Sequence, residues 1–270
     1  MNVISSLSFT GALWLLITGV ASGHLFISSP SPIDATAVKE PLSADGEDFP
    51  CHGVSLPKKG GMRMSAGSMQ SLEFDTGNGA NTAVHGGGSC QISITYESDP
   101  VSLKDPRNWK VLYSIQGGCP SNTHLNLDGT FTSSTGSYHG SWPCTNESTN
   151  GIDCVNAFEF RIPKGLKDGH AIVAWTWFNT VGNRHMFMNC IDVDIKGGDG
   201  SEMLSLPSMF VANIGNGCDT PENYDLAFPA PGQYLTTKKA AVRSSYVVTP
   251  YPTFTPDQKS CTHPDPSKPE

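Results

Sequence analysis

The sequence lacks an apolar run long enough to span a bilayer. The apolar stretch GALWLLITGV, residues 11–20, has the length found in signal peptides, and no cationic stop-transfer segment follows it. Residues 1–23 contain no charged side chain, and Ala21 and Gly23 supply the small side chains that signal peptidase prefers. We therefore expect a signal peptide over residues 1–23, with the exact cleavage point left open by this segment alone, and a secreted protein without a membrane span.

Charged residues are also scarce. They make up 16% of the chain, and the net charge at pH 7 is −8. A chain with this charge balance is a poor ligand for nucleic acid or anionic lipid, so we expect neither as a partner. Ser, Thr, Asn and Gly take the place of charged residues, as is common in extracellular β proteins.

No long segment shows the period of an amphipathic helix. Instead, six short segments are rich in β-branched and aromatic residues, and each is bounded by Gly, Pro, Asn or Asp. In SCQISITY, Ile92 and Ile94 alternate with polar neighbours, which is the period of a strand. Strands and turns at regular intervals, without an internal repeat, favour an all-β fold of the sandwich type. The expected strands are residues 70–74, 90–96, 109–115, 157–162, 171–178 and 186–195.

The CxxC motif is absent, which makes a structural zinc site a weak interpretation. All eight cysteines follow the signal peptide, and an even number in a secreted chain indicates up to four disulfides. Cys144 and Cys154 flank a polar loop and can close locally, whereas the residues alone leave the other pairings open. The same loop contains Asn146-Glu147-Ser148, a candidate glycosylation sequon. The cysteines are Cys51, Cys90, Cys119, Cys144, Cys154, Cys190, Cys218 and Cys261.

The chain changes character after about Gly232. Residues 233–270 are rich in Pro, Thr and Lys, and apolar alternation ends after VRSSYVV. No apolar tail follows, which excludes a GPI signal. We expect one β domain over residues 24–232 and a C-terminal tail over residues 233–270, tied back in part through Cys261.

A histidine at the mature N-terminus offers a metal two nitrogens, the α-amine and the imidazole. If cleavage precedes His24, one more imidazole completes a three-nitrogen set, which suits copper(II). His85, in TAVHGGGSCQ, is the sharpest candidate, because the glycines after it permit a tight turn and leave open space beside its ring. By spacing alone, a surface turn histidine stays the alternative for His85. The remaining histidines are His52, His124, His139, His170, His185 and His263.

A series of motifs, in order along residues 24–232, carries a family resemblance. They are HLFISSPSP, DFPCHG, AVHGGGSCQ, WKVLYSIQGGCP, AWTWFNTVGNRHMFMNC, and MFVANIGNGC followed by FPAPG. With them the chain resembles the lytic polysaccharide monooxygenases and, more narrowly, is similar to the fungal chitin-active auxiliary activity family eleven. The resemblance implies an immunoglobulin-like β-sandwich with long loops, disulfides and an exposed copper site. It also implies one copper ion held by His24 and His85, cleavage before His24, and a disulfide between Cys51 and Cys190.

The segment GNRHMFMNC, residues 182–190, carries the positions beside the expected copper. Alternate side chains of a strand share a face, so His185, Phe187 and Asn189 point one way. The same alternation sends Met186 and Met188 inward to the core, which argues against a role for these two as copper ligands.

The resemblance assigns roles at two of these positions and at Ala83. Phe187 matches the family's axial position, where this group usually has Tyr; a phenylalanine cannot ligate and blocks the axial site by bulk alone. His185 stands where the group usually has Glu; it can hydrogen-bond and transfer protons, although an unwanted ligand or a core residue are the alternatives. Ala83 matches the small residue near the distal axial site.

For Trp175 and Trp177, core packing is favoured over a substrate platform.

The implied function is a secreted, copper-dependent monooxygenase that cleaves glycosidic bonds oxidatively. Its expected partners are chitin or another β-linked cell-wall polysaccharide, an external electron donor, and oxygen or peroxide, and we expect a monomer. A hydrolase needs paired carboxylates in a cleft, but acidic residues such as Asp45, Glu47 and Asp48 are scattered in loops. The second alternative is a non-catalytic copper- or polysaccharide-binding protein of the same fold, motivated by His185 and Phe187.

Overall fold

The computed structural model describes residues 25–77, 84–127, 130–133, 136–144, 151, 154–181, 184–238, 241–243, 246–248, 251–256 and 261. The helical elements that these ranges describe over their full length are the short α-helix α1 (Pro100–Leu103) and the single turns η1 (Asp34–Thr36), η2 (Cys51–Gly53) and η4 (Pro106–Asn108). None of the helices in these ranges is long and apolar enough to cross a membrane. The strands are β1 (Ile27–Ser29), β2 (Met62–Ser65), β3 (Met69–Phe74), β4 (Val84–Gly87), β5 (Ser89–Thr95), β6 (Lys110–Gln116), β7 (Ser121–Leu127), β8 (Thr130–Ser133), β9 (Gly136–His139), β10 (Phe158–Arg161), β11 (Gly169–Phe178), β12 (Met186–Lys196), β13 (Asp225–Leu226), β14 (Leu235–Thr237), β15 (Ala241–Arg243), β16 (Tyr246–Val248) and β17 (Thr253–Phe254).

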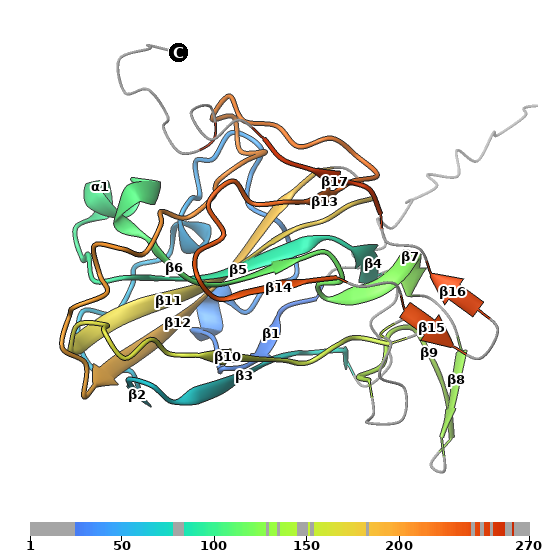
Figure 1. The fold of residues 1–270 in the computed structure, drawn as a ribbon, viewed down its shortest axis with the longest axis horizontal. Coiled ribbons are helices and arrows are strands. Elements are labelled where there is room, and N and C mark those ends of the chain that lie inside the picture. Colours follow the sequence, from blue (N-terminus) through green and yellow to red (C-terminus); the bar gives the residue numbers. More distant parts are fainter. Residues whose placement is uncertain are drawn as a thin grey trace, which may run out of the picture.

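Two sheets face each other across the main core (Figure 1). The larger sheet has the strand order β14–β6–β5–β11–β12–β2, and the smaller has the order β1–β3–β10. Pairing is antiparallel except at the two edges of the larger sheet, where β2 and β14 run parallel to their neighbours. Ile27 and Leu72 of the smaller sheet share one buried cluster with Ile92 and Trp175 of the larger. The β-sandwich predicted from the sequence is therefore confirmed.

All six strands expected from the sequence are present, as β3, β5, β6, β10, β11 and β12, with ends that agree within two residues. Each is rich in the β-branched and aromatic side chains that pack well on a pleated sheet. The strands that were not expected have two to four residues, or, like β7 (SNTHLNL), carry mostly polar side chains. They form hairpins and edges, where little apolar surface is buried and the sequence pattern is correspondingly weak.

The central strands of the larger sheet, such as β5 and β11, are buried on both faces. The sheet's second face packs against loop residues that include Leu42, Phe49 and Phe210. The polar residues that alternate with the isoleucines of β5 are therefore buried as well. Gln91 donates from Nε2 to Ser114 Oγ at 3.1 Å and accepts from Phe210 N at 3.0 Å. These hydrogen bonds offset the cost of burying an amide and hold the covering loop against the sheet.

Four disulfides pair all eight cysteines. The local Cys144–Cys154 bridge and the Cys51–Cys190 bridge are both present, as expected. Since Cys190 lies on β12, the latter bridge fixes the turn η2 on the second face of the larger sheet. The remaining bridges are Cys90–Cys119 and Cys218–Cys261.

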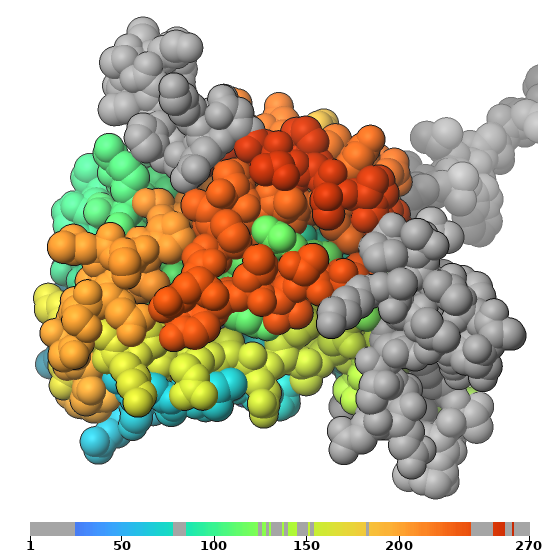
Figure 2. Space-filling model, viewed as in Figure 1, coloured from blue at the N-terminus to red at the C-terminus, as the bar shows by residue number. Residues whose placement is uncertain are grey.

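The chain beyond Gly232 packs on the domain at several points. β14 extends the larger sheet at β6, β17 pairs with β13, and Cys261 is bonded to Cys218. Figure 2 shows the orange and red residues of this C-terminal part lying across one face of the molecule. The tie-back through Cys261 is therefore confirmed. The domain boundary at residue 232 stays a prediction, as does the signal peptide, because residues 1–23 lie outside the described part of the chain.

Candidate metal centre

His85 lies in β4, which pairs with β7 as a two-stranded ribbon at one end of the molecule (Figure 1). Its Nδ1 lies 2.8 Å from Oδ1 of Asn126, the residue directly opposite on β7. Because an amide oxygen can only accept, Nδ1 carries the proton and Nε2 presents the lone pair. A hydrogen bond of this kind on the far nitrogen orients metal-ligating histidines and fixes their tautomer.

Burial favours the neutral form of both histidines at this end of the sandwich. It lowers the pKa of His85 below the ordinary value of 6.5, and the hydrogen bond that His85 donates to Asn126 Oδ1 opposes the shift only in part. Burial also lowers the pKa of His185, and the nearby charge of His85 lowers it further. Both shifts favour the neutral imidazole, which is the form in which histidine binds a metal.

Four aromatic and imidazole rings form a row beside this site. The ring centroid of Trp177 lies 6.4 Å from that of His85 and 4.6 Å from that of Phe187. Phe187 in turn meets the ring of His185 edge-on at 6.0 Å. The structure therefore brings His85 together with His185 and Phe187, which are far from it in the sequence. Strand alternation had predicted only that His185 and Phe187 share a face.

The two faces of β12 are as alternation predicts. Phe187 joins the cluster between the sheets and is 1% exposed, while Met186 and Met188 join the cluster on the opposite face. Trp175 and Trp177 are both 0% exposed, so their side chains pack in the core and do not form a surface platform.

Three of the residues singled out in the sequence lie outside the described residues: His24, Ala83 and Asn146. Among the residues that the structure does describe, no group of three or more His, Cys, Asp or Glu side chains could hold a metal. The ligand set of His24 with His85 stays a prediction, as do the contribution of Ala83 and the glycosylation of Asn146.

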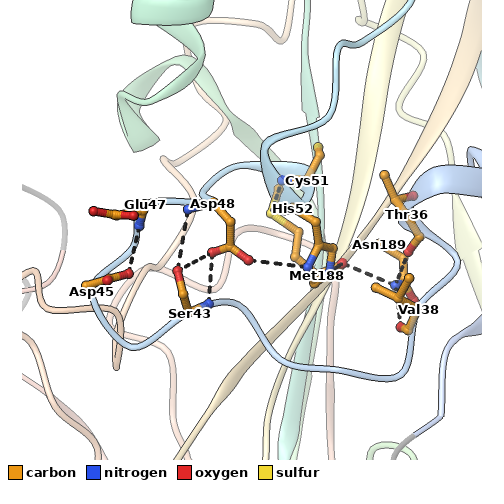
Figure 3. Close-up of polar contacts among 10 residues, drawn as sticks. All are labelled: Thr36, Val38, Ser43, Asp45, Glu47, Asp48, Cys51, His52, Met188 and Asn189. Carbon is orange, nitrogen blue, oxygen red and sulfur yellow. Dashed lines mark hydrogen bonds and ion pairs between the residues drawn. The ribbon is translucent and has the colours of Figure 1, made fainter.

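Asn189 fixes the N-terminal segment to β12, a role that sequence reasoning missed (Figure 3). Its Oδ1 accepts a hydrogen bond from the backbone N–H of Ile27 at 3.1 Å, and its Nδ2 donates to the carbonyls of Thr36 at 2.6 Å and Val38 at 3.2 Å. Asn189 is 1% exposed, so these bonds are shielded from water. Since Ile27 follows His24 by three residues, Asn189 determines where the chain emerges toward the N-terminus. A polar residue inside a buried strand was the available sequence signal.

His52 and the acidic loop before it form a structural network on the other side of β12 (Figure 3). His52 Nε2 lies 2.9 Å from the carbonyl of Met188, and its Nδ1 lies 3.4 Å from Asp48 Oδ2. Asp45 accepts from the backbone N–H of Glu47, and this hydrogen bond is the main cause of its lowered pKa. A general acid of a hydrolase needs a raised pKa, so Asp45 is a poor candidate for that role.

The glycines after His85 are required by backbone conformation and by close packing. Gly87 and Gly88 have φ values of +71° and +92°, in the region that side chains other than glycine rarely adopt. A Cβ on Gly88 would lie 2.4 Å from Trp177 Nε1 and 2.6 Å from the carbonyl of Phe178. The open space expected beside the His85 ring stays a prediction, and the structure shows that the core fills the space beside Gly88.

Replacing Gly88 with alanine is expected to lower the free energy of unfolding by more than about 2 kcal/mol, because strain and overpacking combine. Gly197→Ala is the matched control, since Gly197 has a φ of +80° but nothing within 4 Å of its would-be Cβ. This control isolates backbone strain, which costs about 1 kcal/mol. Thermal unfolding of both variants measures the difference, and equal melting temperatures would contradict the packing argument.

Sequence comparisons assign the family. No family model matches the chain. It is 36% identical over 257 residues to a protein of Aspergillus oryzae named AA11 family lytic polysaccharide monooxygenase, with 89% of this chain and 55% of that protein covered. It is 32% identical over 231 residues to AA11 family lytic polysaccharide monooxygenase A of Aspergillus fumigatus, with 79% of this chain and 85% of that protein covered.

The chain spans about half the length of the first relative, at 55%, and of a second one from Aspergillus fumigatus, at 51%. Among solved structures, the extended catalytic domain of H. jecorina LPMO9A aligns with a TM-score of 0.38 at 15% identity, over 80% of this chain and 74% of that one. The identity to these sequence relatives shows that this chain belongs to the AA11 family of lytic polysaccharide monooxygenases.

Proposed function

We propose that this chain is a secreted, copper-dependent monooxygenase that cleaves glycosidic bonds oxidatively, with chitin as its substrate. The proposal rests on one observation above the others, the orientation of His85 by Asn126. The contact at Nδ1 fixes the tautomer whose Nε2 is the donor, and burial keeps the ring neutral. A neutral imidazole with a fixed outer partner is a fitting donor for copper(II), which prefers nitrogen ligands in tetragonal geometry.

In this proposal His85 contributes one nitrogen and His24 contributes its imidazole and its α-amine. Asn189 supports the arrangement by holding Ile27, which follows His24 by three residues. Bound copper supplies the redox chemistry, with electrons from an external donor. The protein holds the nitrogens in place and presents them beside a rigid aromatic row, so that little reorganisation is needed during the reaction.

The proposed net reaction inserts one oxygen atom into a C–H bond next to the glycosidic linkage. With peroxide as co-substrate, R–H and H₂O₂ give R–OH and H₂O; with dioxygen, two electrons and two protons are consumed as well. The hydroxylated carbon then eliminates the neighbouring sugar, which breaks the chain. His185 is the residue we propose to hold or transfer the protons, because burial favours its neutral, proton-accepting ring and the ring lies beside Phe187. Phe187 offers no ligand atom and excludes solvent by its bulk.

The remaining parts of the proposal concern partners and location. Chitin is the proposed substrate, and another β-linked wall polysaccharide is the alternative. We propose secretion through a signal peptide over residues 1–23, one copper ion per chain, and action as a monomer. Ala83 is the small residue that we propose lies near the bound copper.

Mass spectrometry of reaction products tests the proposal. Protein that begins at His24 is loaded with copper and incubated with β-chitin and ascorbate, with and without peroxide. Oxidised chitooligosaccharides are expected from the wild type and should be absent for His85→Ala. An absence of oxidised products from a copper-loaded wild type would overturn the monooxygenase proposal for this substrate, and His185→Glu would then show whether the histidine at this position is the cause.

A second candidate function is a binding protein of the same fold that does not oxidise its ligand. His185 and Phe187, which replace the residues usual in the related group, favour it. Reduction of the bound copper discriminates between the two. Copper that ascorbate cannot reduce, as followed by loss of the copper(II) EPR signal, supports the binding protein and contradicts the enzyme.

A further inference from the structure

Asp225, the first residue of β13, is a buried carboxylate with no part in the proposed ligand set. The residue is 1% exposed. Its Oδ1 accepts a hydrogen bond from the backbone N–H of Gly88 at 2.8 Å and another from the hydroxyl of Thr180 at 2.9 Å. A charged acceptor strengthens both bonds, and burial of the carboxylate strengthens them further.

The two donors lie on the two chain segments that carry the histidines of the site. Gly88 ends the glycine turn that begins directly after His85. Thr180 follows the end of β11 and precedes His185 by five residues. The backbone of Asn223 adds a third tie, because its N–H donates to the carbonyl of Thr180 at 2.8 Å. One carboxylate oxygen therefore joins the segment after His85 to the segment before His185.

Close packing restricts how far the glycine turn can move. A Cβ on Gly87 would lie 2.9 Å from ring carbons of Tyr251 and 3.0 Å from Thr180 Oγ1. Gly88 is pressed against Trp177, whose ring faces His85. A shift of the turn in either direction meets an aromatic ring, so the hydrogen bonds to Asp225 select one position within a narrow range.

The positive charge that balances Asp225 comes from Lys238, which lies after Gly232 in the chain. Lys238 Nζ lies 3.8 Å from Asp225 Oδ2, and the side chains are 3% and 2% exposed. The Lys238 ammonium also lies 5.5 Å from the ring centroid of Tyr251, within range of a cation–π contact. Burial lowers the pKa of Lys238, and the carboxylate opposes this shift. A buried ion pair adds little net stability compared with apolar residues of similar volume, so stability alone is a weak reason for this pair.

We propose that Asp225 is a positioning residue of the copper site. Its Oδ1 fixes the Gly88 turn against Thr180 and so sets the position of the His85 imidazole relative to the segment that carries His185. Lys238 supplies the compensating charge. This inference rests on the proposed copper function.

Two double variants test the role of Asp225 Oδ1. They differ in whether residue 225 keeps an oxygen that can accept hydrogen bonds. Asp225→Asn/Lys238→Met removes both charges but keeps an amide oxygen that can accept from Gly88 and Thr180. Asp225→Leu/Lys238→Met removes the charges and the acceptor at similar volume. The copper(II) EPR spectrum and the copper affinity, measured by chelator competition, report on the loaded site. The ¹⁵N shifts of the His85 ring and the amide exchange of Gly88 report on the metal-free protein.

The Asn/Met variant is expected to retain the wild-type EPR spectrum, ring shifts and Gly88 protection. The Leu/Met variant is expected to lose about 10- to 100-fold in copper affinity, the range typical of lost outer-shell contacts, with altered hyperfine splitting and faster Gly88 exchange. Wild-type spectra and affinity in the Leu/Met variant would overturn the inference. Equal losses in both variants would also overturn it, because they would show that the charge matters and the acceptor does not.

Thr180→Val keeps the test decisive if the Leu/Met variant does not fold, because it removes one donor without touching either charge. Changed His85 ring shifts in this variant are expected, and unchanged shifts would overturn the inference. If the wild-type protein binds no copper, the proposed function fails, while the metal-free ring shifts still decide whether Asp225 positions His85.

Discussion

The His85→Ala variant is expected to bind copper(II) more than about 100-fold more weakly than the wild type, because the loss of a ligand exceeds the loss of an outer-shell partner. Only the two nitrogens of His24 would remain. The fold should persist, since His85 lies in a two-stranded ribbon outside the two facing sheets and its side chain is only partly buried. Chelator competition measures the affinity, and thermal unfolding confirms that the variant is folded.

His170→Ala is the matched control for His85→Ala. His170 lies near the start of β11, at the opposite end from Trp177, and its Nε2 pairs with Asp192 Oδ1 at 2.6 Å. Its removal deletes a histidine without touching the proposed site, so wild-type copper affinity is expected. Equal losses in the two variants would indicate nonspecific binding by surface histidines and would contradict the assignment of His85.

A chain shortened to end at Gly232 is expected to be largely unfolded at 37 °C. Loss of the Cys218–Cys261 bridge, which spans 43 residues, costs about 4 kcal/mol by the loop-entropy relation. Loss of Lys238 removes the countercharge of the buried Asp225 carboxylate, which costs about 3–5 kcal/mol. Domains of this kind are stable by only about 5–15 kcal/mol, so the two losses together consume most of that margin.

Circular dichroism during thermal unfolding measures the effect of this truncation. A chain that ends at Cys261 keeps every contact described for the C-terminal part and is expected to melt with the wild type. The full-length double variant Cys218→Ser/Cys261→Ser separates the contribution of the bridge from that of Lys238 and β14. A protein ending at Gly232 that melts within a few degrees of the wild type would show that the segment after residue 232 is a dispensable tail.

The strands of the core could be predicted because their signal is local. Segments such as β5 and β11 combine β-branched and aromatic residues with turn residues at both ends, and the pleat then fixes which side chains share a face. Strand alternation therefore predicted that Phe187 and Asn189 share one face of β12 and that Met188 lies on the other. Burial of β5 on both faces could not be predicted, because it depends on loops that arrive from elsewhere in the sequence.

The candidate site was less accessible to sequence reasoning than the core. His85 and His185 were recognised through motifs, but the partners that orient the site are long-range. Asn126 lies 41 residues after His85, and Asp225 lies 137 residues after Gly88. In sequence, Asp225 stands in a polar loop-like stretch, ENYDLAFP, where a solvent-exposed carboxylate is the ordinary expectation. Only the fold shows that this residue is buried beside the glycine turn.

The outer edge of β6 has a consequence for how the protein behaves at high concentration. This strand, KVLYSIQ, is apolar, and an uncovered edge of this kind can pair with the same edge of another molecule. Pro207 accepts from the N–H of Val111 at the beginning of the strand, and β14 pairs with Ser114–Gln116 at its end. Two separate segments therefore block strand addition, and loss of either is expected to make the protein prone to self-association before it affects the chemistry of the distant histidines.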